Sequence, residues 1–239
     1  MAAQNCEITV TGQGVHVLPA ERAVLILKVQ SNEVESQKEA TAIVTATANT
    51  LREMIHPLYP TVEGTGRAAD DAAIVHYAMT TMGTASVTKY NKDWDESKPR
   101  FCADVEFHIK FRDFGAINGF ATKVSAMDNV AIGRISWNLT EETLLTATAV
   151  ARKAAGRSAV QKAHDFAQVV CGVEESACAA RIVPVEVTEN RSYAHSTRPQ
   201  LHFGKALRGT STGDHELQFE PEDVSVEIAI NVSFEVIKP

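Results

Sequence analysis

Alanine recurs at every fourth position along a segment of about residues 140–170. The repeat comprises Ala147, Ala151, Ala155, Ala159, Ala163 and Ala167. Residues four apart share one face of a helix, so these alanines predict a ridge without bulk that another backbone element can approach closely. Thr140 is the predicted N-cap, and Glu141 and Glu142 follow where the helix dipole favours negative charge. We expect the helix to end near Gly172.

Three other segments have the hydrophobic pattern of strands. Apolar and polar residues alternate over Phe101–Phe111 and over Val224–Val236, which predicts strands with one packed and one exposed face. The almost continuously apolar segment Ala23–Val29 predicts a central strand. Further strands are expected at 130–137 and 179–187.

Glycines suggest turns at two places between apolar positions. Ile8 and Val10 followed by Gly12-Gln13-Gly14 predict the first arm of a hairpin. The segments 73–82 and 84–90 predict a second hairpin, joined tightly at Gly83.

Helical periodicity marks two further segments. Apolar residues follow helical spacing from about Glu33 to Ile55, after a possible capping box of Asn32 and Glu35. Asp113 is the predicted N-cap of a helix that carries Ile117, Phe120 and Val124, among other apolar residues.

The order of these elements mixes hairpins with helix-linked strands. It predicts an α+β fold: a mainly antiparallel sheet with helices packed on one side, among them the long alanine-rich helix. We expect a single domain over residues 1–239. A stretch without periodicity, about 188–223, predicts a long loop, and loops of that length are often functional.

Composition narrows the possible partners. The net charge is −7 and the isoelectric point is about 5.6, so nucleic acid is not an expected partner. No apolar run approaches the ~20 residues that cross a bilayer. The beginning of the chain lacks the pattern of an export signal, which predicts a cytoplasmic protein.

The four cysteines are scattered along the chain, and we expect them to act as small hydrophobes in a reducing compartment. Neither a metal nor a cofactor is predicted.

His76 and His108 could form a metal or acid/base pair if they faced each other on neighbouring strands. A solvated His108 is the simpler interpretation, because no metal-binding spacing accompanies the pair.

The long loop carries the candidate ligand-binding residues His195, Arg198, His202 and Arg208. Imidazole and guanidinium groups could gather there around an anion. Trp94, which stands among acidic residues, is the candidate partner-binding residue. No catalytic residue is predicted, because neither a Gly-x-Ser-x-Gly elbow nor a complete dinucleotide-binding fingerprint occurs.

Several motifs together resemble the SIMPL domain family along nearly the whole chain. They are residues 8–14 with Pro19 and Val24–Val29, residues 135–140, Ala151–Ala155 continuing to Lys162-Ala163, and the alternating strand from Val224. The resemblance implies a role in stress tolerance or kinase-associated signalling, and for some members assembly into rings. It carries over no catalytic residue. Pro221-Glu222 departs from the Pro-Gly that often precedes the last strand, and the missing export signal suggests an intracellular branch.

Two hypotheses of function follow. The first is a non-catalytic protein that self-associates or binds a protein partner, motivated by the alanine ridge and the absence of a catalytic constellation. The alternative is an enzyme or small-molecule binder whose pocket lies between the sheet and the 188–223 loop.

Overall fold

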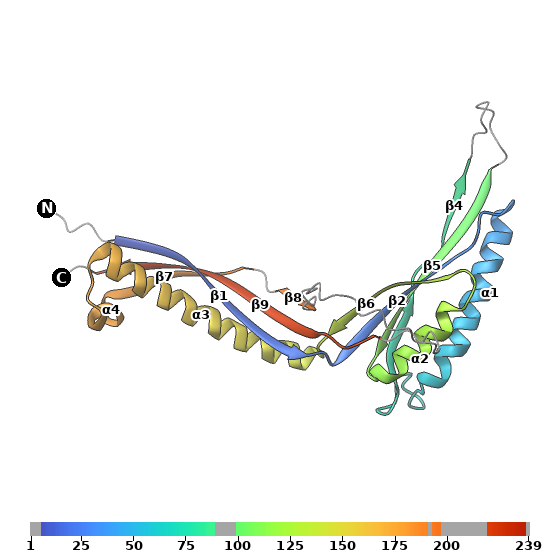
Figure 1. The fold of residues 1–239 in the computed structure, drawn as a ribbon, viewed down its shortest axis with the longest axis horizontal. Coiled ribbons are helices and arrows are strands. Elements are labelled where there is room, and N and C mark those ends of the chain that lie inside the picture. The colour runs from blue at the N-terminus through green and yellow to red at the C-terminus, as the bar shows by residue number, and fades with distance from the viewer. Residues whose placement is uncertain (1–5, 89–98, 191–192, 197–218, 238–239) are drawn as a thin grey trace, which may run out of the picture. The chain divides into compact units, whose positions relative to one another are not determined.

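The computed structural model describes residues 6–88, 99–190, 193–196 and 219–237. The chain divides into two compact units (Figure 1). The first comprises residues 1–20, 138–198 and 222–239, and the second comprises residues 21–137 and 199–221. Each unit has its own antiparallel sheet and its own helices, so the predicted α+β class is confirmed.

The sheet of the first unit has β9 at its centre. Its elements are β1 (Cys6–Pro19), α3 (Glu141–Cys171), α4 (Glu175–Arg181), β7 (Ile182–Glu189), β8 (Tyr193–Ser196) and β9 (Asp223–Val236). β1 pairs with one edge of β9 along its whole length, while β7 and β8 pair with successive parts of the other edge. The predicted loop at 188–223 therefore contains the end of β7 and the short strand β8.

The predicted alanine-rich helix is confirmed as α3. It begins after Thr140, whose Oγ1 accepts a hydrogen bond from the backbone N–H of Thr143, and it ends at Gly172 with a φ of +66°. Such a φ suits glycine, which has no Cβ to clash with the carbonyl. The helix residues that are buried are the six alanines of the ridge, and they form one core with Ile8, Val10 and the apolar residues of β9.

Gly12 and Gly14 lie within β1, so the predicted hairpin turn at Gly12-Gln13-Gly14 is wrong. A Cβ built on Gly12 would collide with the carbonyl oxygen of Ala155, and one on Gly14 with that of Ala151. These glycines are therefore needed for close approach of the strand to the helix. Turns and close backbone contacts both favour glycine, which explains why these glycines predicted a turn.

The second unit is built around β5. Its elements are β2 (Arg22–Gln30), α1 (Gln37–Ile55), the short 3₁₀ helix η1 (His56–Leu58), β3 (Ile74–Met79), β4 (Gly83–Val87), β5 (Arg100–Phe111), α2 (Phe114–Ser125) and β6 (Val130–Asn138). The sheet order is β3-β5-β2-β6, which confirms the predicted interior position of Ala23–Val29. Alternate residues of β2 and β5 are buried, and α1 packs against both strands.

The predicted hairpin joined at Gly83 is wrong, because β3 and β4 both pair with β5, one after the other along the same strand. Thr80, which lies between them, keeps the chain on that edge. Its backbone N–H donates to the carbonyl of Glu106, and its Oγ1 accepts from the backbone N–H of Glu106.

Two other boundaries differ from the prediction. α1 begins at Gln37 and is capped by Ser36, because Val34 forms a β-bridge with Phe101 instead of joining the helix. Residues 179–181, predicted as strand, close the helix α4 before β7 begins. The predicted cap is confirmed at Asp113, whose Oδ1 accepts from the backbone N–H of Gly115 at the start of α2.

The contact between β1 and α3 leads to a test with an internal control. We expect Gly12→Ala and Gly14→Ala each to lower the free energy of unfolding by about 1–3 kcal/mol, since the new methyl group meets helix backbone that cannot move aside. The measurement is urea unfolding followed by far-ultraviolet circular dichroism.

Gly156→Ala is the matched control. Gly156 lies in α3 with nothing within 4 Å of an added Cβ, so this change should raise stability by about 0.5–1 kcal/mol. If all three variants shifted stability in the same direction, the close-contact explanation would be contradicted.

Candidate functional site

A polar surface covers the face of the first unit's sheet that points away from α3. Alternate residues of β1 and β9 point to this face, and cross-strand hydrogen bonds connect them. Thr9 Oγ1 and Ser233 Oγ lie 2.9 Å apart, and Thr11 Oγ1 donates to Asn231 Oδ1 at 2.8 Å. Thr9, Thr11 and Asn231 are exposed.

A hollow of about 540 Å³ lies on this unit, between β1, β9 and the end of β7. It is lined by Gln13, Gly14, Val15, Asn190, Glu227, Ile228 and Ala229. Asn190 is the first residue after β7, so the hollow adjoins the start of the predicted loop. Its polar side chains are two amides and one carboxylate, which suit a small ligand with hydrogen-bond donors or positive charge.

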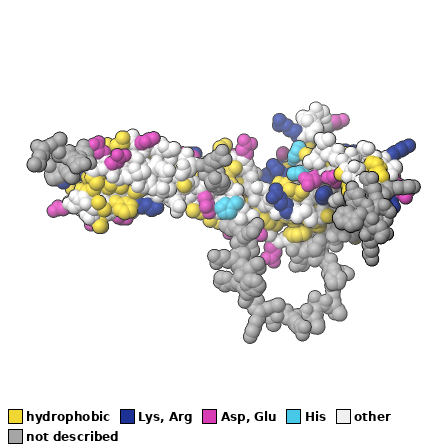
Figure 2. All heavy atoms as spheres, turned by 90° about the horizontal axis from the view of Figure 1, so that it is seen from above, with side chains coloured by type: hydrophobic (Ala, Val, Ile, Leu, Met, Phe, Trp, Pro, Cys, Tyr) yellow, Lys and Arg dark blue, Asp and Glu magenta, His cyan; other side chains and the backbone are white. Residues whose placement is uncertain are grey.

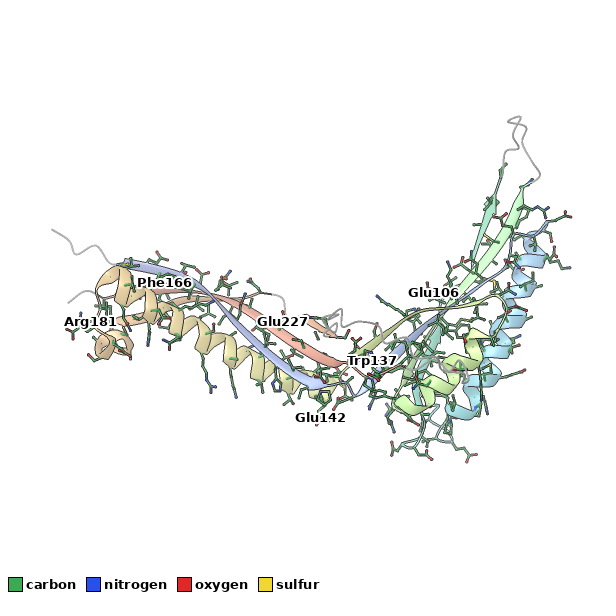
Figure 3. The ribbon with its side chains drawn as sticks, in the orientation of Figure 1. Glu106, Trp137, Glu142, Phe166, Arg181 and Glu227 are labelled. Atoms are coloured by element: carbon green, nitrogen blue, oxygen red, sulfur yellow. The ribbon has the colours of Figure 1, made fainter. Side chains whose placement is uncertain are left out.

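Glu227 of β9, which is labelled in Figure 3, lies beside a histidine and a serine. His195 Nε2 on β8 lies 3.7 Å from Glu227 Oε1, and Ser225 Oγ donates to the same oxygen at 3.4 Å. About half of each ionisable side chain is exposed, so solvent screens the ion pair that forms when His195 is protonated. The serine hydroxyl donates to the Glu227 carboxylate, and the imidazole of His195 lies beside the same carboxylate, so Glu227 connects the two groups.

The structure locates one of the five residues predicted as candidate binding sites. His195 lies in β8 beside Glu227. Arg198, His202, Arg208 and Trp94 lie outside the described residues. Sequence reasoning missed Gln13, Asn190 and Glu227. They are ordinary polar positions in or next to strands, and they become a group only when β1 and β7 both pair with β9.

His76 and His108 stand on neighbouring strands, but the register places them opposite other residues. His76 is paired with Lys110, and His108 with Ala78. His108 Nε2 lies 3.6 Å from Glu106 Oε2, and both side chains are well exposed. The part of the chain that the structure describes contains no group of three His, Cys, Asp or Glu side chains that could hold a metal.

The two edges of the first unit's sheet differ in how well they are protected against pairing with another strand. On the edge formed by β1, Lys162 Nζ of α3 donates to the carbonyl oxygen of Thr11 at 2.7 Å, and a lysine there discourages pairing with another strand. On the other edge, Val185 and Val187 of β7 are 65% and 62% exposed. Within the described ranges β7 pairs only with β9, so its outer edge presents both backbone groups and apolar side chains.

Apolar side chains are also exposed near the end of α3. Phe166 is 50% exposed, and Val169, one turn further, is 85% exposed. Figure 2 shows hydrophobic side chains gathered at the left end of the view, where α4 and β7 lie. Exposed apolar surface of this kind marks many interaction sites.

One ion pair attaches the end of β7 to α3. Arg152 Nε lies 2.7 Å from Glu189 Oε2, and its Nη2 donates to Glu189 Oε1 at 3.0 Å, a two-pronged contact. The hydrogen bond from Arg152 lowers the pKa of Glu189, while the same hydrogen bond and the charge of Glu189 raise the pKa of Arg152. The free end of the exposed strand is thus held by charge.

Together these features define an α+β protein with paired antiparallel strands, a helix set closely upon them and an open polar face. The model of the SIMPL family, described as a protein of unknown function (DUF541), matches residues 8–234, so the chain belongs to the SIMPL family. No curated protein matches the chain. Among the described residues, no helix is both long and apolar enough to cross a membrane.

The Arg152–Glu189 contact has a pH dependence whose direction follows from the lowered pKa of Glu189. A carboxylate with a depressed pKa stabilises the fold above its ordinary pKa of 4.5, and that stabilisation is lost as pH falls through the folded-state value. Glu189→Gln should therefore lower the melting temperature by at most a few degrees at neutral pH, and the difference should shrink as the medium is made more acidic than pH 4.5. Thermal melts of both proteins across that range measure it; a difference that grew on acidification would contradict it.

Proposed function

We propose that this SIMPL protein is non-catalytic and works by association, through the outer edge of β7. The observation that carries the proposal is the exposure of a whole strand. Every residue of β7 after Ile182 is exposed, and three of them are valines. Pairing of this edge with a second strand would satisfy its backbone groups and cover the valines.

Burial of the exposed valines would favour pairing of β7 with another strand. Full burial of one valine side chain stabilises by about 1.5–3 kcal/mol, so Val183, Val185 and Val187 together give a driving force large enough to offset part of the entropy lost on association. Pro184 and the bulge between Pro184 and Glu186 limit open-ended pairing, since they interrupt the ladder at the start of the strand. The occupant we favour is a second copy of the chain, with a strand of another protein as the alternative.

We propose further that the two compact units form one functional domain, because the family match spans segments of both. A cytoplasmic location stays a prediction from the pattern at the beginning of the chain, and a role in stress response or signalling stays a prediction from the resemblance.

A double variant and a control variant test association through β7. The double change Val185→Lys and Val187→Lys places charge on the edge and should convert an oligomer to a 25.9 kDa monomer in light scattering at ~100 μM protein. Val62→Lys is the matched control, because Val62 is 48% exposed and belongs to the second unit, whereas β7 belongs to the first. This control should leave the oligomer intact.

Two results would contradict self-association through β7. One is an unaltered chain that remains at 25.9 kDa at the same concentration. The other is an oligomer that withstands the double lysine change as well as it withstands Val62→Lys.

The hollow beside Glu227 supports the second candidate function, a small-molecule binder. Its position next to Asn190 agrees with a pocket between the sheet and the predicted loop. We expect Glu227→Gln to weaken binding of a small organic cation by about tenfold, since one charge-assisted hydrogen bond contributes ~1.5–3 kcal/mol. A library of small organic cations screened by ligand-observed NMR provides the measurement, with Glu235→Gln on the same strand as control.

A further inference from the structure

Two cysteines that are 165 positions apart in the chain meet in the first unit. Cys6 lies at the start of β1 and Cys171 at the last residue of α3, and their Sγ atoms are 2.7 Å apart. This separation places the two sulfur atoms in direct contact, close enough for a disulfide bond of ~2.05 Å to form with a small movement of the side chains. Both are thiols in this structure, and both side chains are partly exposed.

The packing of α3 on β1 fixes this meeting. Cys171 follows Ala167 by four residues, so it occupies the next position of the alanine ridge. Cys6 has the same strand phase as Ile8 and Val10, which belong to the core beneath that ridge. The two thiols are therefore the last pair of a regular interface.

The rise per residue of β1 and of α3 explains why residues of the strand stay matched to residues of the helix along the interface. Two residues of a strand advance by about 6.6 Å, and four residues of a helix advance by about 6 Å. Gly14 meets Ala151, and Gly12 meets Ala155 and Ala159, so each step of two along β1 corresponds to about one step of four along α3. Continued over three such steps from Gly12 to Cys6, this correspondence leads from Ala155 and Ala159 to Ala167 and Cys171.

We propose that Cys6 and Cys171 form a dithiol redox site that is oxidised to an intramolecular disulfide by a hydroperoxide. One thiol, as the thiolate, attacks a peroxide oxygen and becomes a sulfenic acid, while the O–O bond breaks and water leaves when the peroxide is hydrogen peroxide. The second thiolate then attacks the sulfenic sulfur, the S–S bond forms and a second water leaves. Two thiols lose two electrons and two protons, and the peroxide gains them.

The disulfide would fasten the first residue of β1 to the last residue of α3. The ridge buries only small side chains, so the helix end depends on few large apolar contacts, and a covalent bond there constrains a long loop of the unfolded chain. The inference is independent of the association proposed for β7. It requires only the thiol pair, and it assigns no role to Cys102 or Cys178.

Peroxide titration of the full chain tests the site. The reduced protein carries four thiols, and hydrogen peroxide at a small molar excess should leave two, as counted with a chromogenic thiol reagent. Trypsin together with a Glu-specific protease cuts after Glu174 and Glu175, which separates Cys171 from Cys178, so mass spectrometry can identify a Cys6–Cys171 cross-link. A reductant should restore all four thiols.

Variants and a thermal readout complete the experiment. Oxidation should raise the melting temperature of the unaltered chain and of Cys102→Ser by roughly 5–15 °C, and should leave Cys6→Ser and Cys171→Ser unchanged. Four remaining thiols, a cross-link to Cys102 or Cys178, or a covalent dimer would each overturn the proposal. The mass measurement uses the unaltered protein, so it decides the question even where a serine variant folds poorly.

Discussion

The first unit depends on the close approach of α3 to β1. Alanine presents only a methyl group, and glycine presents nothing, so the helix backbone comes within contact of the strand backbone at Gly12 and Gly14. Small residues alone bury little apolar area, and the stabilisation of this core comes instead from the larger residues of β9 and from Ile8 and Val10. Small side chains set the distance, and large ones fill the remaining space.

This constraint also determines what the rest of the unit presents to solvent. Because the ridge uses only one residue in four, the other faces of a 31-residue helix remain uncovered, and Phe166 and Val169 lie there. Because α3 covers one face of β1 and β9, the opposite face is left for polar pairs and for the hollow beside Glu227. The exposed apolar residues and the candidate pocket are thus both consequences of one packing arrangement.

Periodicity predicted the fold well where a single face of an element is buried. The alternation in β5, the ridge of α3 and the caps at Asp113 and Thr140 are local patterns, and the structure confirms each of them. Glycine misled the prediction at Gly12 and Gly83, because one residue type serves turns, bulges and close contacts alike.

The sites were harder to predict, because they depend on strand register. Glu227 meets His195 only through the pairing of β8 with β9, and Cys6 meets Cys171 only through the docking of α3. In the sequence these residues are merely polar strand positions or scattered thiols. A tertiary contact between distant segments leaves no local periodic signal, so neither group could be assembled from spacing alone.

The contrast between the two sheet edges supports the proposal that β7 pairs with a partner strand. An exposed strand edge can pair with other chains, and the same sheet covers part of its other edge with Lys162. The ion pair between Arg152 and Glu189 holds β7 extended on the sheet, although it covers none of the valines. β7 is therefore already ordered, and its exposed side chains include three valines. Binding of a partner strand would not cost the conformational entropy of ordering β7.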